Sequence, residues 1–166
     1  MIFVRINWED FDMTIRKLSI EDLALLTRLR VDFLLDEEAA FSESELIGLQ
    51  QKCKEFFTAA FEANRFIAFA AEENGEVLST AFLGIHEKPP RRAGVPFRMG
   101  TLYNVMTYKE HRRRGLATQV LKALFNEAKL VGIESVDLWA TEEGKKLYET
   151  LGFFSINCTP MKINFE

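Results

Sequence analysis

Residues 101–125 read TLYNVMTYKEHRRRGLATQVLKALF, and the fold prediction depends on the change of pattern within them. The first half continues a run that begins at Arg98 and is rich in residues typical of a strand. From Gly115 to about Val131 apolar residues recur at helical spacing, and Gly132 follows as a typical C′ residue. The sequence therefore predicts a strand, a turn with three arginines and an amphipathic helix.

Downstream of this helix, the pattern predicts another strand and a short helix. Residues 135–140, SVDLWA, form the strand, and residues 141–151, TEEGKKLYETL, form the helix, with Gly152 as its stop. Two strands joined through a helix make a right-handed parallel crossover. The tail, residues 153–165, is interpreted as two short strands broken at Pro160.

Upstream, the sequence predicts a first strand over residues 14–18 and then two helices. The first helix begins with Ser19 as its N-cap and ends near Asp36, and the second covers residues 45–62 after a capping box that starts at Ser42. The second helix carries apolar residues at helical spacing: Leu46, Leu49, Cys53, Phe56, Phe57 and Phe61.

A hairpin is predicted next, over residues 65–87. Two apolar runs flank Asn74 and Gly75, and this dipeptide favours a type I′ turn because both of its residues tolerate positive φ. Both faces of these strands are apolar, so we expect them inside the sheet. Residues 87–97, EKPPRRAGVPF, are too rich in proline and glycine for a helix or a strand and predict an exposed loop.

Together these elements predict an α/β (α+β) fold in the order β-α-α-β-β-β-α-β-α-β-β. The sheet has six to seven strands, mostly antiparallel but mixed because of the crossover, and about four helices flank it. We expect one domain over residues 1–166, since this length suits a single core. Residues 1–12 are interpreted as an N-terminal extension, with Met13 as a candidate natural start.

Composition narrows the classes of function. The formal net charge is −4, whereas domains whose surface is built for nucleic acid are usually strongly basic. Cys53 and Cys158 lie far apart without a CxxC motif, so neither a metal site nor a disulfide is predicted. There is no stretch of the ~18 to 20 apolar residues that a membrane helix needs, and no signal-peptide pattern. We therefore expect a cytoplasmic protein without membrane contact.

The arginine turn combines two features that attract anions. Unpaired N–H groups at a helix start converge on phosphates, and Gly115 allows close backbone approach. The sequence contains neither the Walker phosphate loop, GxxxxGK[ST], nor the dinucleotide-binding motif, GxGxxG. Residues 112–117 instead fit the pattern RxxGxA. Taken alone, three arginines are more often a solvated charge run or a nucleic-acid patch.

The segment TLYNVMTYKEHRRRGLATQVL, followed by LWATEEGKKLYETLGF, resembles the acetyl-CoA signature of the GNAT N-acetyltransferases. That signature is a strand, a [QR]xxGx[GA] turn with its helix, a strand, and a helix that ends in LYExLGF. The resemblance covers residues 14–166 in element order and is strongest in motif over residues 101–154. It implies acetyl-CoA as cosubstrate, without a metal.

The resemblance also implies which residues hold the cofactor. In the family, backbone N–H groups of the turn bind the pyrophosphate, the preceding strand pairs with the pantetheine arm, and one of its N–H groups, here Met106 or a neighbour, polarises the thioester carbonyl. Thr141 stands where many members have asparagine, and Gly144 where they have alanine. The implied cofactor residues are Val105, Met106, Thr107, Arg112, Arg113, Arg114, Gly115, Leu116, Ala117, Thr118, Thr141 and Gly144.

Tyr148 matches the family tyrosine that protonates the departing CoA thiolate. A phenol with a pKa of ~10 keeps its proton at neutral pH and can donate it to a thiolate of pKa ~8.5. The implied reaction is a direct attack of a neutral primary amine on the thioester, with a small molecule ahead of a peptide amine as acceptor. The alternatives are a non-catalytic CoA-binding or regulatory module and, with least support, a nucleic-acid binder.

By the same resemblance, Arg30, Phe33 and the loop over residues 88–97 flank the acceptor cleft, and Tyr103 is a further candidate substrate residue. The sequence leaves the general base open among four candidates by residue type: Glu110, His111, His86 and Tyr103. Three arginines in or beside the loop, Arg91, Arg92 and Arg98, favour an acceptor with a carboxylate or phosphate. We expect a monomer or a homodimer.

Overall fold

The computed structural model describes residues 13–37, 40–89, 97–157 and 159–165. The predicted extension, residues 1–12, lies outside them. The elements in chain order are β1 (Met13–Leu18), the short 3₁₀ helix η2 (Ile20–Asp22), α1 (Leu23–Glu37), α2 (Glu43–Glu62), β2 (Phe66–Glu73), β3 (Glu76–Lys88), β4 (Phe97–Thr107), η3 (Lys109–His111), α3 (Leu116–Leu130), β5 (Ser135–Asp137) and α4 (Glu142–Thr150).

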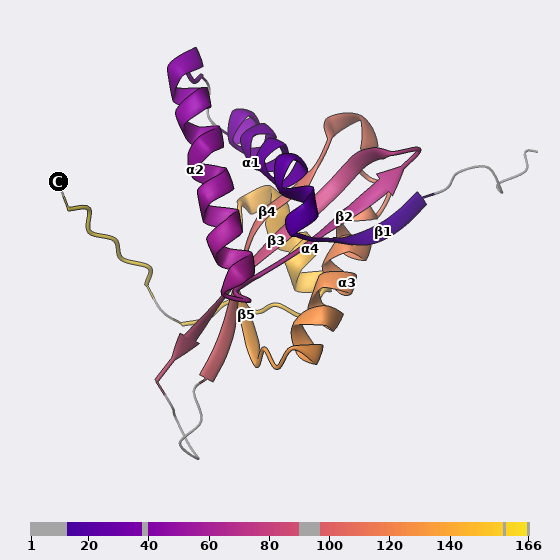
Figure 1. Cartoon of the computed structure of the whole chain (residues 1–166). Helices are drawn as coiled ribbons and strands as arrows, with labels where there is room; N and C mark the ends of the chain where they lie inside the picture. Colours follow the sequence, from indigo (N-terminus) through magenta and orange to yellow (C-terminus); the bar gives the residue numbers. More distant parts are fainter. Residues whose placement is uncertain (1–12, 38–39, 90–96, 158, 166) are drawn as a thin grey trace, which may run out of the picture.

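The strands form one sheet in the order β1-β2-β3-β4-β5, with α1 and α2 on one face and α3 on the other (Figure 1). The first three pairings are antiparallel, whereas β4 and β5 are parallel across α3, as the crossover requires. The mixed, mostly antiparallel α+β prediction is therefore confirmed.

Each face of the sheet has its own apolar core. The α3 face is filled by buried helix residues, Leu116, Val120, Leu121, Leu124 and Ala128. The α1 and α2 face is filled by Leu26, Leu29, Cys53 and Phe57 together with Phe66 and Phe82 from the sheet. Because β2 and β3 are covered on both sides, most of their residues are buried, as their two apolar faces predict.

Several local signals act as the sequence predicts. Ser19 and Ser42 each complete a capping box. Asn74 and Gly75 have φ of 52° and 79°, which fits the type I′ turn, and Gly132 follows α3 with φ of 78°.

The predicted number of strands is too high. Within the described residues the sheet has five strands, and the two strands predicted for the tail do not form in residues 153–157 and 159–165. A strand needs a partner for its backbone groups, and this segment lies outside the sheet. The helical spacing of α2 also predicted Phe56 on its apolar face, but this residue is 54% exposed.

A β-bulge interrupts β4 opposite β3. Phe82 faces Tyr103 and Thr80 faces Met106, so two residues of β4, Asn104 and Val105, stand against one of β3. Asn104 has φ of 54° and is buried, and its Nδ2 donates to the carbonyl oxygen of Leu29 in α1 at 3.3 Å. The bulge therefore joins α1 to the strand that was predicted to run on to Glu110 but ends at Thr107.

Gly100 fits where β4 packs most closely against β3. A Cβ at this position would lie 2.7 Å from Leu83 Cδ1 and 2.9 Å from its Cγ. We expect Gly100→Ala to lower the free energy of unfolding by about 1 to 3 kcal/mol, the usual cost of overpacking a core. Urea denaturation measures this. Gly48→Ala is the control, because its Cβ meets no atom within 4 Å in α2 and alanine favours a helix. Equal stability of both variants would contradict the tight packing.

Candidate active site

The site lies where β4 and β5 separate. The two strands pair only over residues 99–101 and 135–137, and β4 continues beyond this to Thr107. A cleft of about 460 Å³ opens beside the unpaired part. Many of the predicted site residues line this cleft: Phe33, Tyr103, Val105, Met106, Thr107, Arg112, Ala117, Thr141, Gly144 and Tyr148.

The turn before α3 points a row of free amides outward. Arg113 and Gly115 both have positive φ, 63° and 75°, and Gly115 caps α3 without a side-chain hydrogen bond. Gln119 is the first residue of α3 whose N–H bonds to a backbone carbonyl, that of Gly115 at 3.2 Å. In the described part of the chain, the N–H groups from Arg113 to Thr118 have no acceptor. Such a row of amides is a typical anion site.

The flanking arginines already hold carboxylates. Arg112 Nη2 lies 3.1 Å from Asp36 Oδ2, and its Nε donates to the carbonyl oxygen of Thr107 at 3.0 Å. Arg114 Nη2 lies 2.7 Å from Glu73 Oε1. A hydrogen bond from Lys109, reinforced by the charges of Lys109 and Arg112, lowers the pKa of Asp36 below its usual value, so Asp36 is ionised at neutral pH.

Tyr148 reaches the cleft from α4, and its position depends on Gly144. Thr141 is the N-cap of α4, and its Oγ1 accepts from the N–H of Gly144 at 3.1 Å. A Cβ on Gly144 would lie 3.2 Å from this Oγ1 and 3.3 Å from Tyr148 Cε2. Glycine therefore lets the tyrosine ring lie close to the helix start. Burial raises the pKa of Tyr148 above its usual value, so the phenol keeps its proton at neutral pH.

Tyr103 lines the cleft, and Arg30 lies behind its wall in contact with two lining residues, Asn104 and Phe33. Arg30 Nη1 donates to Asn104 Oδ1 at 3.2 Å, and its guanidinium lies 5.4 Å from the centre of the Phe33 ring. The Tyr103 hydroxyl is buried without a hydrogen-bond partner among the described residues. A buried hydroxyl without a partner is costly, so this group stands out among the buried polar atoms of the protein.

Of the four candidate bases, only Tyr103 lines the cleft. Burial raises its pKa far above the usual value, so its phenol keeps its proton at neutral pH and does not suit the role of a base. His111 lies beside Arg114 outside the cleft, and His86 faces Met99 in the β3–β4 ladder.

Of the three arginines predicted in or beside the loop, Arg98 is described by the structure and does not line the cleft. The guanidinium of Arg98 donates to the carbonyl oxygen of Val131 at the end of α3. Arg91 and Arg92 lie outside the described residues.

Sequence reasoning missed several residues of the cleft wall. Asp36 and Glu37 come from the end of α1, and Leu138 and Trp139 follow β5. Helical spacing offered one signal, because Asp36 lies three residues after Phe33 and shares its face. Asn104 gave a weaker signal, because asparagine favours turns and yet this one stands within an apolar strand.

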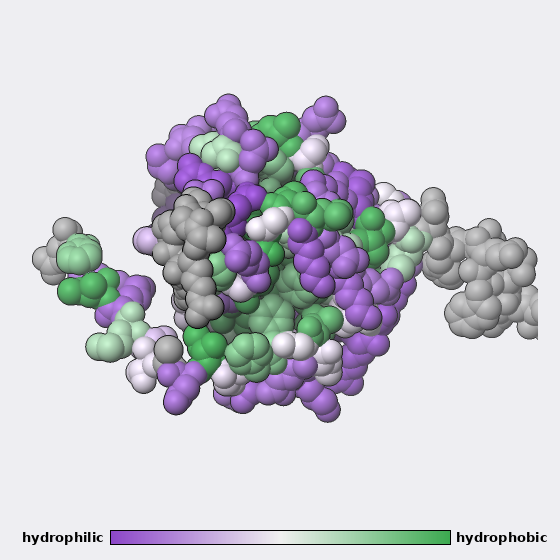
Figure 2. All heavy atoms as spheres, turned by 90° about the horizontal axis from the view of Figure 1, so that it is seen from below, coloured by the Kyte–Doolittle hydropathy of each residue, from purple (hydrophilic) through white to green (hydrophobic). Residues whose placement is uncertain are grey.

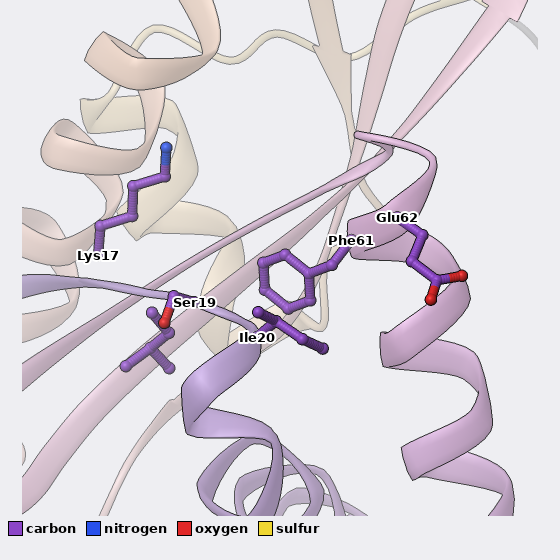
Figure 3. Close-up of a pocket in the computed structure, with 6 residues that line it drawn as sticks. Lys17, Ser19, Ile20, Phe61 and Glu62 are labelled. Atoms are coloured by element: carbon purple, nitrogen blue, oxygen red, sulfur yellow. The ribbon is translucent and has the colours of Figure 1, made fainter.

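A second hollow, of about 540 Å³, lies between the end of β1 and the end of α2 (Figure 3). Ile20 and Phe61 form its apolar wall, and Lys17 at its rim is paired with Glu127 at 2.6 Å. It holds none of the predicted site residues. In the described ranges there is no helix with the length and apolar character needed to cross a bilayer.

The model of the acetyltransferase (GNAT) family matches residues 27–153, which is more than half of the chain. None of the curated proteins matches the sequence.

Solved structures share the fold over almost the whole chain. A predicted acetyltransferase from Clostridium acetobutylicum, solved with acetyl-CoA, is 27% identical, with a TM-score of 0.79 over 92% of this chain and 96% of that one. A GCN5-related N-acetyltransferase from Ralstonia eutropha is 26% identical, with a TM-score of 0.72 over 91% and 98%. An aminoglycoside N-acetyltransferase in complex with CoA is 15% identical, with a TM-score of 0.70 over 96% and 99%, and shows the fold alone.

Proposed function

The chain belongs to the GNAT family of acetyltransferases, and from this membership we propose that it transfers the acetyl group of acetyl-CoA to a primary amine. The observation that carries the proposal is the pairing of two features at one cleft. The turn with the free amides contributes Arg112 and Ala117 to its lining, and the protonated phenol of Tyr148 lines it as well.

The turn is the proposed seat of the CoA pyrophosphate. The amides from Arg113 to Thr118 would bind its oxygens, and Arg112 and Arg114 would add charge. Hydrogen bonds to charged groups contribute roughly 1.5 to 3 kcal/mol each, so several of them suffice for firm binding. The pantetheine arm would pair with the backbone of β4 at Val105, Met106 and Thr107, which lie beyond the part of β4 that pairs with β5.

In the proposed reaction the nitrogen of the neutral amine attacks the thioester carbonyl carbon. The new C–N bond forms, the C–S bond breaks, and the Tyr148 hydroxyl gives its proton to the sulfur. The amine nitrogen loses one proton to water, and the Tyr148 phenolate takes one proton back from water. Water fills this role because Tyr103, the one base candidate named from sequence that lines the cleft, keeps its own proton. An N–H of β4, at Met106 or a neighbour, would polarise the carbonyl oxygen.

The acceptor would enter from the side of α1. Arg30, Phe33 and Tyr103 provide a cation, an aromatic face and an unpaired hydroxyl at that end. Small-molecule amines are the first class to test, and peptide amines the second. Structures of similar fold include a glucosamine-6-phosphate and an aminoglycoside N-acetyltransferase, whose names already cover two kinds of sugar amine.

Thermal shift with acetyl-CoA, CoA and a short DNA duplex tests the proposal. We expect both forms of CoA to raise the melting temperature and the duplex to leave it unchanged. A thiol-release assay over a panel of amines then identifies the acceptor. Stabilisation by CoA without turnover on any amine would favour the non-catalytic module, and no stabilisation would reject the proposal.

Neutralising Asp36 should strengthen cofactor binding. Asp36 is ionised and holds Arg112 next to the proposed pyrophosphate seat, and an exposed ion pair of this kind contributes ~0.2 to 1 kcal/mol. We expect Asp36→Asn to lower the Kd for CoA about two- to fivefold in isothermal titration calorimetry. Glu37→Gln is the matched control, because it removes the same charge from the next residue of the cleft wall. A larger effect in the control would show that Arg112 is not the group released.

A further inference from the structure

Arg30 differs from the other cations of the protein in its surroundings. Hydrophilic residues surround the face shown in Figure 2, and most of the described lysines and arginines are exposed; the half-buried ones are Arg16, Arg30 and Arg98. Arg16 is held by two carboxylates at 2.7 and 3.0 Å, and the guanidinium of Arg98 donates to the carbonyl oxygen of Val131. Arg30 forms no ion pair within the described part of the chain.

The guanidinium of Arg30 has hydrogen-bond donors left over. Its Nη1 donates to Asn104 Oδ1 at 3.2 Å, and this is its one hydrogen bond to the described residues. The other N–H groups of a guanidinium form a planar fork that fits the paired oxygens of a carboxylate or a phosphate. Because a half-buried charge is costly without a counterion, Arg30 suits an anion that comes from outside the chain.

Helix α1 brings Arg30 to the cleft one turn before Phe33, and the guanidinium lies 5.4 Å from the centre of the Phe33 ring. Phe33 and Asn104 both line the cleft, as does Tyr103. Burial raises the pKa of Tyr103, and the charge of Arg30 opposes part of this rise, so the guanidinium lies near the phenol as well. An anion beside these residues would neutralise Arg30 and offer an acceptor to the unpartnered Tyr103 hydroxyl.

Arg112 is the one cation that lines the cleft itself, and it is already committed. It lies 3.1 Å from Asp36 and belongs to the turn that is the proposed seat of the pyrophosphate. The cations around the cleft thus fall into two groups, with Arg112 and Arg114 at the arginine turn and Arg30 on the side of α1. A second anion, distinct from the phosphates of the cofactor, would meet Arg30.

We propose that Arg30 selects acceptor amines that carry an anionic group, either a carboxylate or a phosphate. The inference rests on the proposed function, since it concerns the amine that receives the acetyl group. The anion binds to the free N–H groups of Arg30, and this contact directs the amino group of the same molecule toward the thioester. Arg30 is thus a specificity-determining residue that takes no part in the bond changes.

Matched pairs of amines test this selection in the wild-type protein. Each anionic amine is paired with a neutral analogue: phosphoethanolamine with ethanolamine, β-alanine with its amide, and larger amines in the same form. The amines are titrated calorimetrically into protein saturated with CoA, which fills the cofactor site without turnover. We expect at least one anionic amine to bind about tenfold or more tightly than its analogue, because charge-assisted hydrogen bonds are the stronger ones. The phosphate and carboxylate pairs tell which anion is preferred, and equal binding within every pair would overturn the proposal.

Variants of Arg30 then assign the preference to this residue. We expect Arg30→Gln to weaken binding of the preferred anionic amine about tenfold and to leave the Kd for CoA unchanged. Arg30→Lys keeps the charge and should restore part of the preference, although lysine lacks the planar fork. Arg28→Gln is the matched control, because it removes the same charge from an exposed position of α1. If Arg30 served only to hold the bulge through Asn104, Arg30→Gln would lower stability and keep the preference, which would overturn the proposal.

The thiol-release assay separates this inference from the proposed function. Equal kcat/KM for anionic amines and their neutral analogues would leave the transferase in place and overturn the role of Arg30. Tighter binding of anionic amines, lost in Arg30→Gln but without turnover on any amine, would support the role of Arg30 and reject the transfer reaction.

Discussion

Gly115→Val is expected to weaken acetyl-CoA binding at least tenfold. Gly115 has φ of 75°, a conformation that costs an L-residue roughly 1 to 2 kcal/mol, and β-branched residues adopt it least readily. The turn would relax toward negative φ and move the amides from Leu116 to Thr118 out of convergence. Losing one charge-assisted hydrogen bond of ~1.5 to 3 kcal/mol already exceeds a tenfold change in affinity. Titration calorimetry measures the Kd directly.

Gly75→Val is the matched control for this variant. Gly75 has φ of 79°, and a Cβ at either glycine meets no atom within 4 Å, so the two substitutions introduce comparable backbone strain. Gly75 lies in the β2–β3 turn, outside the cleft residues. We expect both variants to lose stability and only Gly115→Val to lose affinity. Similar affinities in the two variants would remove the turn from the cofactor site.

Tyr148→Phe is expected to lower kcat about a hundredfold with little change in the affinity for acetyl-CoA. A positioned general acid contributes 10²- to 10⁴-fold, and a thiolate leaves readily enough that the lower end applies. Phenylalanine keeps the ring that packs against Phe153 at 5.9 Å, so the helix and the cleft wall should persist. Steady-state kinetics with a thiol reporter separates kcat from KM. Unchanged turnover would remove Tyr148 from the acid role.

Tyr108→Phe controls for the loss of a phenol outside the cleft. The Tyr108 hydroxyl donates to Asp32 Oδ2 at 2.5 Å, so this variant should lose stability. Because Tyr108 does not line the cleft, we expect kcat to stay within about twofold, which corresponds to ~0.4 kcal/mol in the activation barrier. The pH profile gives a second check. Burial raises the pKa of Tyr148, and we expect no loss of wild-type turnover between pH 7 and ~10, the pKa of a free phenol. A fall near pH 8 would assign the proton to another group.

Local signals in the sequence were enough to predict most of the fold. The capping boxes at Ser19 and Ser42 and the Asn74 turn depend on neighbouring residues, and the structure confirms each of them. The tail strands failed because pairing depends on a distant partner that the alternation of Met161 and Ile163 does not name. The register of β4 against β3 could not be predicted either, because the bulge at Asn104 leaves no trace in the hydropathy pattern of the strand.

The candidate site was predictable where one motif contains it. The arginine turn and the helix with Tyr148 stand within one stretch, and Arg112 and Ala117 from the first and Tyr148 from the second line one cleft. Asp36 was not predictable as a neighbour of Arg112, because it comes from α1 and reaches the turn only through packing of that helix on the sheet. The need for Gly144 beside Tyr148 likewise appears only when the Cβ distances are known.

The ion pairs of the arginine turn also bear on selectivity. Asp36 and Glu73 act as built-in counterions, so the exposed charge of the turn is much smaller than three arginines suggest. An anion that offers charge alone, such as the backbone of a nucleic acid, would have to compete with these carboxylates and would release few ions from the protein. An anion that also fills the row of amides gains contacts that no side chain supplies. As the proposed pyrophosphate seat, the turn would therefore select by shape and hydrogen bonding among the many phosphates of a cell.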